Sequence, residues 1–276
     1  MHGTSQRTGY LPVFKGYKRT LWDKITSKEG TPIYDWGYVS GTRRTVLENY
    51  DGGYYGSNEF REAHSKFFEG KLWKGEEIYY EVVGFTHTGT PIMATANNKK
   101  LNDKDFIKQY GNETVFSYGC YANGRKVEPV VDEKWGHGIS VESAPQSDIY
   151  VYRMTMTNED GDVVEYTPDF MRYRCEQMGV KTVPVFWKGT VTGGIDIDGC
   201  AYGPGDEAKY FAEKFYDGQD PIGKTHIREG VVVRIINRPK FTAYKHKNFA
   251  FKVLEGIVKA DAVAPDMEEA EDTIDV

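Results

Sequence analysis

Short apolar runs rich in β-branched and aromatic residues dominate the hydrophobic pattern of this chain. Such runs, set between polar and glycine-containing stretches, are typical of strands. The expected strands cover residues 78–85, 149–155, 180–186, 230–236 and 248–254. Helices interrupt these runs without a regular alternation of strand and helix. The pattern therefore predicts an α+β domain with antiparallel sheets and flanking helices.

Helical signals mark three other stretches, at residues 57–70, 167–179 and 206–218. The first offers Ser57 as N-cap, and the second offers Thr167 as N-cap with proline at the first helical position. Each of the three stretches ends at a glycine, which is typical of a helix C-terminus. We therefore expect three helices among the strands.

Two segments show neither the hydrophobic period of a strand nor that of a helix. The first seven residues, MHGTSQR, have no apolar periodicity and are expected to lie in a loop. Residues 95–147 are largely polar and irregular, so we expect a loop-rich insertion there. The sequence shows no signal peptide and no apolar run long enough to span a membrane. Its three dispersed cysteines do not suggest a disulfide framework, and a cytoplasmic location is expected.

Charge is distributed unevenly along the chain. The net charge is −6, but residues 265–276 hold six acidic residues and no basic one, so the rest of the chain is neutral. A neutral body can still carry a local basic groove, and the overall charge does not exclude a nucleic-acid partner. We expect one domain over residues 1–260 and a disordered acidic tail over 261–276.

Candidate chemistry starts with two neighbouring stretches, REGVVVR and YKHKNFAFK. The first places Glu229 at the mouth of an apolar strand, where a carboxylate is costly to bury without a cation or a metal. The second places Lys245 and Lys247 two residues apart, so in a strand both side chains leave the same face. A carboxylate for Mg²⁺ beside two lysines for phosphate suits a nucleoside triphosphate. The alternative is an ordinary solvated strand pair with scattered charges.

Two weaker signals lie earlier in the chain. Glu81 interrupts an apolar strand, with Gly84 close behind it, and could accept a hydrogen bond from a ribose hydroxyl. Arg43 and Arg44 follow a Ser-Gly-Thr turn and could hold phosphate. Taken alone, the first is also compatible with a half-buried strand and the second with a surface turn.

The order of these pieces is more specific than any one of them. His-Gly-Thr, an arginine turn, Tyr-Glu-x-x-Gly, an aromatic strand, Glu-Gly-x-Val-x-Arg and Lys-x-Lys-Asn follow one another over roughly residues 1–255. This series resembles the covalent nucleotidyltransferases, and most of all the ATP-dependent RNA ligases of the RNA-ligase-2 type, which include phage enzymes. The resemblance implies a nucleotidyltransferase domain of two antiparallel sheets around an ATP cleft.

The resemblance also implies roles for individual residues. Glu81 would contact the ribose of the bound nucleotide, and Tyr152 would stack on its adenine. Arg43 would reach phosphate, with Arg44 as the alternative in that turn. Glu229 would act on the side of the bound metal, Mg²⁺, and is the expected metal ligand.

The remaining implied residues surround the reacting phosphate. Lys245 and Lys247 would grip the α-phosphate of ATP, and His2 and Gly3 match the Lys-x-His-Gly signature of this family. The nucleophilic lysine of that signature would stand immediately before Met1, so self-adenylylation of this chain is in doubt.

The implied activity is the sealing of 3′-hydroxyl and 5′-phosphate RNA ends through lysyl-AMP and RNA-adenylate, by a monomer with no membrane partner. The alternatives are a non-catalytic module that binds RNA ends or nucleotides, or an enzyme of the DNA ligase or capping type.

Two further patterns give only weak signals for metal binding. Residues 196–207 resemble a calcium loop only in part, and a plain turn is expected there, because alanine stands where that loop needs glycine. The six histidines show no spacing typical of metal ligands, and surface or supporting positions are expected for them.

Overall fold

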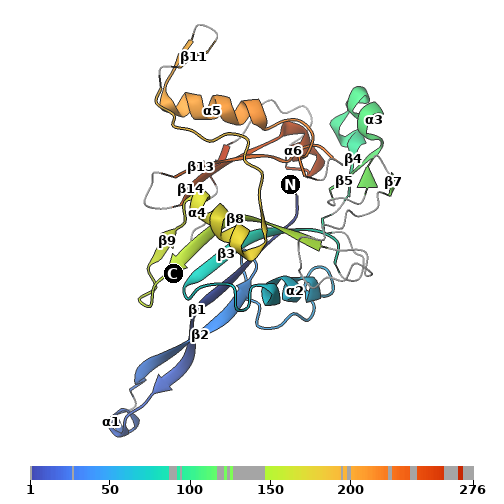
Figure 1. The fold of residues 1–276 in the computed structure, drawn as a ribbon. Helices are drawn as coiled ribbons and strands as arrows, with labels where there is room; N and C mark the ends of the chain where they lie inside the picture. Colours follow the sequence, from blue (N-terminus) through green and yellow to red (C-terminus); the bar gives the residue numbers. More distant parts are fainter. Residues whose placement is uncertain are drawn as a thin grey trace.

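The structure is a computed structural model, and it confirms a mixed α+β architecture with antiparallel sheets (Figure 1). The residues that it describes, to which all structural statements below refer, are 2–26, 28–86, 92–93, 95–116, 121–122, 125–126, 147–193, 195–197, 200–222, 226–236, 241–257 and 267–269.

The larger sheet has six strands. They are β1 (Thr4–Lys18), β2 (Thr31–Gly41), β3 (Glu76–Gly84), β8 (Ser147–Thr157), β9 (Val163–Glu165) and β10 (Lys181–Thr182). The order is β10-β8-β3-β1-β2, and β9 pairs with β8. Every pairing is antiparallel except that of β10 with β8. β3 is the central strand and lies between β8 and β1, so residues Glu76–Gly84 form the middle of this sheet.

A smaller antiparallel sheet and three two-stranded sheets complete the described strands. The smaller sheet has the order β13-β14-β15 and consists of β13 (Gly230–Ile235), β14 (Thr242–Lys247) and β15 (Met267–Glu269). The two-stranded sheets pair β4 (Thr95–Asn97) with β5 (Glu113–Val115), β6 (Tyr121–Ala122) with β7 (Arg125–Lys126), and β11 (Ile195–Ile197) with β12 (Cys200–Tyr202).

The helices surround the two sheets. They are α1 (Leu21–Ile25), α2 (Glu59–Phe67), the 3-10 helix η1 (Asn98–Leu101), α3 (Lys104–Tyr110), α4 (Pro168–Met178), α5 (Pro204–Phe215) and α6 (Phe249–Leu254). None of the described helices is long and apolar enough to cross a membrane.

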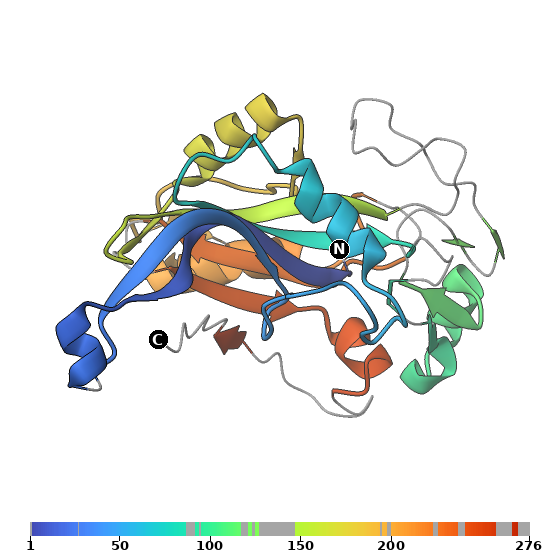
Figure 2. The ribbon, with the colours of Figure 1, turned by 90° about the horizontal axis from the view of Figure 1, so that it is seen from below.

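The main core lies on one face of the larger sheet, under α2 and α4. Buried side chains of β3 and β8, such as Tyr80 and Val151, pack there against Phe60 of α2 and Met171 of α4. Figure 2 shows both helices on this side of the sheet and the smaller sheet on the other side. The second face of the larger sheet is thus the one turned toward β13 and β14.

Three of the five expected strands are confirmed as β3, β8 and β13. Of 180–186, only the two residues of β10 form a strand. The expected strand 248–254 is wrong, because this segment forms α6. The Asn248 side chain caps that helix by accepting hydrogen bonds from the backbone N–H groups of Ala250 and Phe251. The apolar residues of segment 248–254 fit the period of a strand as well as that of a helix, and the Asn248 cap decides for the helix.

The N-terminal residues are the second correction. The chain is already in β1 at Thr4, so the expectation of a loop over the first seven residues is wrong. Polar side chains hold this strand: Gln6 donates to Ser40 Oγ (3.1 Å), and the hydroxyls of Thr8 and Tyr80 share a hydrogen bond (2.9 Å). Because buried polar partners replace apolar residues here, hydrophobic periodicity could not reveal the strand.

The expected helices are present with small shifts. Thr167 caps α4 through a hydrogen bond from Phe170 N (3.3 Å), as expected. Asn58 instead of Ser57 precedes α2, and α5 begins at Pro204, two residues earlier than expected.

The remaining expectations are met only in part. Residues 95–116 contain η1, α3 and the paired strands β4 and β5, so this part of the expected loop-rich insertion has regular structure, whereas most of 117–146 lies outside the described residues. The calcium-like stretch 196–207 covers the β11–β12 hairpin and the start of α5. In the acidic segment, β15 pairs with β14 and departs from the expected disorder, while the rest of the tail lies outside the described residues.

Candidate functional site

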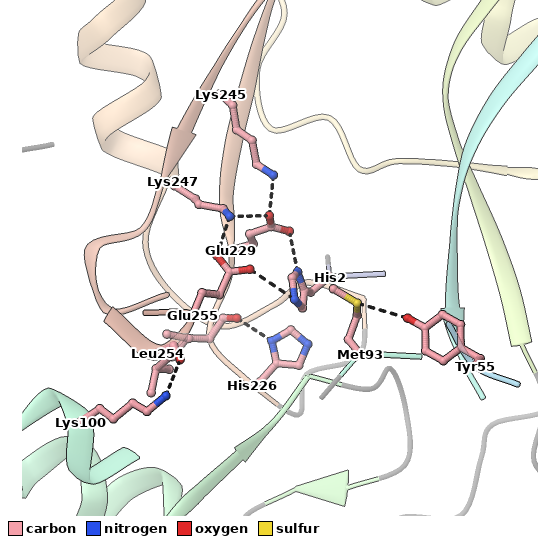
Figure 3. A network of polar contacts seen from close by, with 11 residues as sticks. His2, Tyr55, Met93, Lys100, His226, Glu229, Lys245, Lys247, Leu254 and Glu255 are labelled. Carbon is pink, nitrogen blue, oxygen red and sulfur yellow. Dashed lines mark hydrogen bonds and ion pairs between the residues drawn. The ribbon is translucent and has the colours of Figure 1, made fainter. Parts of the chain in front are cut away.

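Five charged or titratable side chains meet beside the smaller sheet, and we call them the charge cluster (Figure 3). They come from four separate parts of the chain: His2 precedes β1, Glu229 precedes β13, Lys245 and Lys247 lie on β14, and Glu255 follows α6. The fold therefore brings together residues that are more than two hundred positions apart in the sequence.

Glu229 is the centre of the charge cluster. One of its carboxylate oxygens lies 2.6 Å from Lys245 Nζ and 3.7 Å from Lys247 Nζ. Both lysines therefore approach the same carboxylate, as their spacing on one strand predicted. Burial alone would raise the pKa of Glu229, but the His2 ring and the Lys245 charge hold that pKa well below its usual range. Glu229 is thus a buried, ionised carboxylate at neutral pH.

Each lysine also has a carboxylate partner of its own, and that of Lys245 is Glu229. Burial would lower the pKa of Lys245, yet the Glu229 carboxylate raises it. Lys247 Nζ lies 2.5 Å from a carboxylate oxygen of Glu255. Glu255 was not expected from the sequence, because the segment before it was assigned to a strand that would have carried it away from the site.

His2 is fixed between two aromatic rings and two carboxylates. Its ring makes edge contacts with Phe116 and Phe251, at centroid distances of 5.0 and 4.9 Å. Its two nitrogens face different acids, Nδ1 at 3.6 Å from Glu229 and Nε2 at 3.4 Å from Glu255. His2 is therefore part of the charge cluster, and its place beside a nucleotide stays a prediction.

The other described histidines are structural. His64, His226 and His246 are buried, so of the two expected kinds of position, surface or supporting, they fit the supporting one. His64, for example, shares a hydrogen bond with Ser147 Oγ at 2.8 Å.

Gly3 allows the chain to approach β3 beside the charge cluster. A Cβ atom at Gly3 would lie 2.4 Å from the backbone oxygen of Val82 and 2.7 Å from a Val83 methyl carbon. Gly230 has the same role on the smaller sheet, where a Cβ would lie 2.1 Å from the backbone oxygen of His246. These glycines are required by close backbone contact, which matches their positions in the His-Gly and Glu-Gly motifs.

The second face of the larger sheet contributes Glu81 and Tyr152. Glu81 pairs with Ser5 across β1 and β3, so their side chains share a face. Tyr152 is the extra residue of a β-bulge, since Tyr79 pairs with Arg153 and the next residue pairs with Val151. The bulge aims the Tyr152 hydroxyl at Ser5 Oγ, 2.9 Å away. Glu81 and Tyr152 therefore lie on the same face, as their expected contacts with one nucleotide require.

Glu81 has an unusual protonation equilibrium. Burial raises the pKa of its carboxyl to about 7; Glu229 adds to this rise, whereas Lys245 and Arg61 oppose it. The negative charge of Glu229, beside the smaller sheet, thus raises the pKa of Glu81 on the larger sheet, so the residues of the two sheets interact electrostatically.

Replacing Glu81 by glutamine should change the pH dependence of stability. The folded protein keeps a proton on Glu81 between the unfolded pKa of about 4.5 and the folded value of about 7, so the wild type loses stability as the pH rises through this window. The variant Glu81→Gln has no such loss. Urea unfolding should find it more stable than wild type at pH 8, by at most about 3 kcal/mol, with the gain vanishing near pH 4.5.

A suitable control is Glu69→Gln, a change of the same type at an exposed position, which should leave the pH profile unchanged. A Glu81→Gln profile parallel to that of the wild type would show that Glu81 titrates normally.

Arg43 and Arg44 lie in an exposed turn directly after β2. The Thr42 hydroxyl closes this turn by accepting hydrogen bonds from the backbone N–H groups of Arg44 (3.3 Å) and Thr45 (3.2 Å). Because Gly41 pairs with Arg7, the turn stands at the end of the sheet where β1 begins. Among the described residues, no ion pair joins Arg43 to the charge cluster, so its phosphate role stays a prediction.

Arg61 of α2 is a further residue that sequence reasoning missed. Its guanidinium donates to the backbone oxygen of Ser5 (3.0 Å) and to Thr4 Oγ1 (2.6 Å), and its burial lowers its pKa. It ties the start of β1 to α2 and so positions Gly3 and His2. The only sequence signal is an arginine within an amphipathic helix, which is not specific.

Three residues of the charge cluster could hold a metal ion. His2, Glu229 and Glu255 each offer one ligand atom, and these atoms lie within 4.8 Å of one another. Carboxylate oxygens suit Mg²⁺, whereas a ring nitrogen suits transition metals better. The two glutamates therefore fit the expected Mg²⁺, provided that the ion displaces the lysines that now contact them.

Comparison with models of known protein families gives no match, and comparison with curated proteins gives none either.

Proposed function

We propose that this protein is an ATP-dependent RNA ligase with a nucleotidyltransferase fold. The observation that carries this proposal is the convergence of four sequence motifs at one place. Glu81, Glu229, Lys245 and Lys247, together with the His-Gly segment at the N-terminus, meet between two antiparallel sheets. Transfer of a nucleotidyl group needs positive charge aimed at the reacting phosphate, and the paired lysines of this site would supply it.

The lysines supply the charge that such a transfer needs. In the final step, the oxygen of an RNA 3′-hydroxyl would attack the adenylylated 5′-phosphate and give up its proton to the solvent, the phosphoanhydride bond to AMP would break, and AMP would leave with its negative charge. Lys245 and Lys247 would neutralise charge on the phosphate, and Glu229 and Glu255 keep both ammonium groups at the site until phosphate and metal bind. This placement of positive charge at the site supports the proposal.

Two ligands are implied by this chemistry. ATP donates AMP, with Tyr152 stacking on adenine and Glu81 accepting from the ribose. Glu229 and Glu255 would hold Mg²⁺, which neutralises phosphate charge when it is bound. In that state the two lysines would be released from the carboxylates and free to contact phosphate.

Sealing of a pre-adenylylated nick tests the proposal directly. The substrate is a nicked RNA duplex whose 5′-phosphate already carries AMP, so the assay does not depend on the lysine that the resemblance puts before Met1. We expect Mg²⁺-dependent joining, read on a denaturing gel. A folded protein that binds the nick without joining it would favour the non-catalytic module, and preferential joining of a DNA nick would favour a DNA ligase.

A further inference from the structure

One part of the molecule is not used by the proposed chemistry: a long hairpin that leaves the body, which we call the arm (residues 10–38). It comprises most of β1, the short helix α1 and most of β2, and it extends away from the two sheets in both views (Figures 1 and 2). Fifteen residues of β1 correspond to roughly 45 Å. The same strand therefore begins beside the charge cluster and ends far from it.

One face of the arm carries a row of aromatic rings. Near the body, Tyr10 stacks on Tyr38 with centroids 4.6 Å apart and lies 5.9 Å from Trp36. This inner group is anchored, since the Tyr38 hydroxyl accepts a hydrogen bond from Gly70 N (2.6 Å). Packing against the body therefore explains the inner half of the row.

The outer half of the row has no such explanation. The Phe14 ring lies 5.1 Å from Tyr17 and 5.7 Å from Tyr34, and the three side chains are 47, 45 and 58% exposed. Lys15 is the extra residue of a β-bulge, which turns Tyr17 to the same face as Phe14 although they are three residues apart. The bulge thus builds an exposed aromatic surface at the cost of regular pairing.

Positive charge gathers on the arm that carries this surface. The arm holds five basic residues and three acidic ones, a net charge of +2 in a chain of net charge −6. All five basic side chains are exposed, and none forms an ion pair within the described part of the chain; they are Lys15, Lys18, Arg19, Lys24 and Lys28. The Asp23 carboxylate accepts the hydrogen bonds of the Thr20 cap of α1. The arm therefore has the charge that an anionic partner requires.

We propose that the outer arm is a platform for single-stranded RNA, with bases stacked on Phe14, Tyr17 and Tyr34 and phosphates bound by the lysines of the arm. Aromatic rings on a strand surface, together with nearby cations, bind unpaired bases in many RNA-binding sheets. The choice of RNA rests on the proposed function. An anionic membrane meets the same charge requirement and is an outcome of the test, whereas a second copy fits less well because two arms of like charge repel each other.

Direct binding of RNA tests this platform. The probe is a fluorescein-labelled single-stranded oligouridine of about 16 nucleotides, followed by anisotropy. The triple variant Phe14→Leu, Tyr17→Leu, Tyr34→Leu keeps the apolar character of the hairpin and removes the rings. It should bind at least about tenfold more weakly than the wild type. The matched control is Tyr173→Leu, a half-exposed tyrosine of α4, which should bind like the wild type.

A second variant avoids any question of folding. Lys18→Gln and Lys24→Gln change only exposed side chains, and together they should flatten the dependence of log affinity on log salt by about 0.7 for each lost phosphate contact. Wild-type affinity in both sets of variants would overturn the proposal. So would a preference for blunt duplex RNA, arm-dependent binding to anionic vesicles without RNA binding, or arm-dependent dimers in light scattering.

The nick-sealing assay in the same samples keeps the two proposals apart. A nick without single-stranded tails does not need the arm, so the triple variant should seal it like the wild type. A wild-type protein that binds RNA through the arm but does not seal the nick would contradict the ligase proposal and support the RNA platform.

Discussion

Replacing Lys247 by methionine should lower the sealing of a pre-adenylylated RNA nick by at least about a hundredfold. Methionine retains much of the aliphatic stem but removes the ammonium group that lies 2.5 Å from Glu255 and 3.7 Å from Glu229. The loss of one preorganised charge at a reacting phosphate commonly costs about 3 kcal/mol of transition-state stabilisation. Single-turnover joining at saturating RNA measures the effect on the chemical step.

The control for this change is Lys209→Met, which removes an exposed ammonium group from α5. It should seal at the wild-type rate. If Lys247→Met is folded by circular dichroism and still joins RNA at the wild-type rate, the paired lysines do not hold the reacting phosphate and the site assignment is wrong.

Replacing Glu76 by glutamine should have the largest effect on stability, because Glu76 is a fully buried acid at the start of the central strand of the larger sheet. Arg174 donates to both of its oxygens at 2.7 Å, and Tyr166 and the backbone of Trp73 complete the shell at 3.0 and 2.8 Å. The variant leaves the buried guanidinium without a counter-charge. We expect a loss of about 3–5 kcal/mol in the free energy of unfolding.

For a domain of this size, that loss corresponds to a drop of roughly 10 °C in the unfolding midpoint. Differential scanning calorimetry measures it. The exposed pair between Glu62 and Lys66 on α2, with an Nζ–Oε1 distance of 2.6 Å, supplies the comparison, and Glu62→Gln should leave the midpoint nearly unchanged. Equal midpoints for both variants would mean that Arg174 finds another partner or water.

The sequence was most informative where the alternation of side chains along a strand and the unusual polarity of a residue pointed to the same position. Lys245 and Lys247 were predicted to share a strand face, and both approach the same Glu229 oxygen. Glu81 was singled out because an acid interrupts an apolar strand, and its raised pKa reflects that burial. In both cases the alternation of side chains predicts the face of the strand on which the residue lies, and a charged residue in an apolar strand indicates a functional position.

The contribution of Glu255 could not be predicted, because it depends on the secondary structure of the segment before it. Six residues of strand would carry the chain about 20 Å away from β14, whereas six residues of helix advance it only about 9 Å. The hydrophobic pattern of α6 fits both, and the Asn248 cap that decides between them is a single side chain. One wrong element therefore removed one site residue.

The arm was missed for a different reason. Its outer half packs against no core, so no pattern of buried positions records its strands. Pairing with β2 is what defines β1 beyond Leu11, and pairing between distant residues leaves little trace in a single sequence. Polar anchoring of the start of β1, by Gln6 and Thr8, hid the other end of the same strand.

The bulge at Lys15 restricts how the length of the arm can change among related sequences. Side chains alternate along both strands, so the loss or gain of a single regularly paired residue between Tyr10 and Tyr17 would move Phe14 or Tyr17 to the opposite face. Changes in multiples of two, matched in β2, preserve the aromatic row. Deletion of Lys15 is the exception, because it would restore regular pairing and leave Tyr17 two residues after Phe14, on the same face. Natural variants of this hairpin should therefore differ in length by even numbers of residues per strand, or by loss of the bulge residue alone.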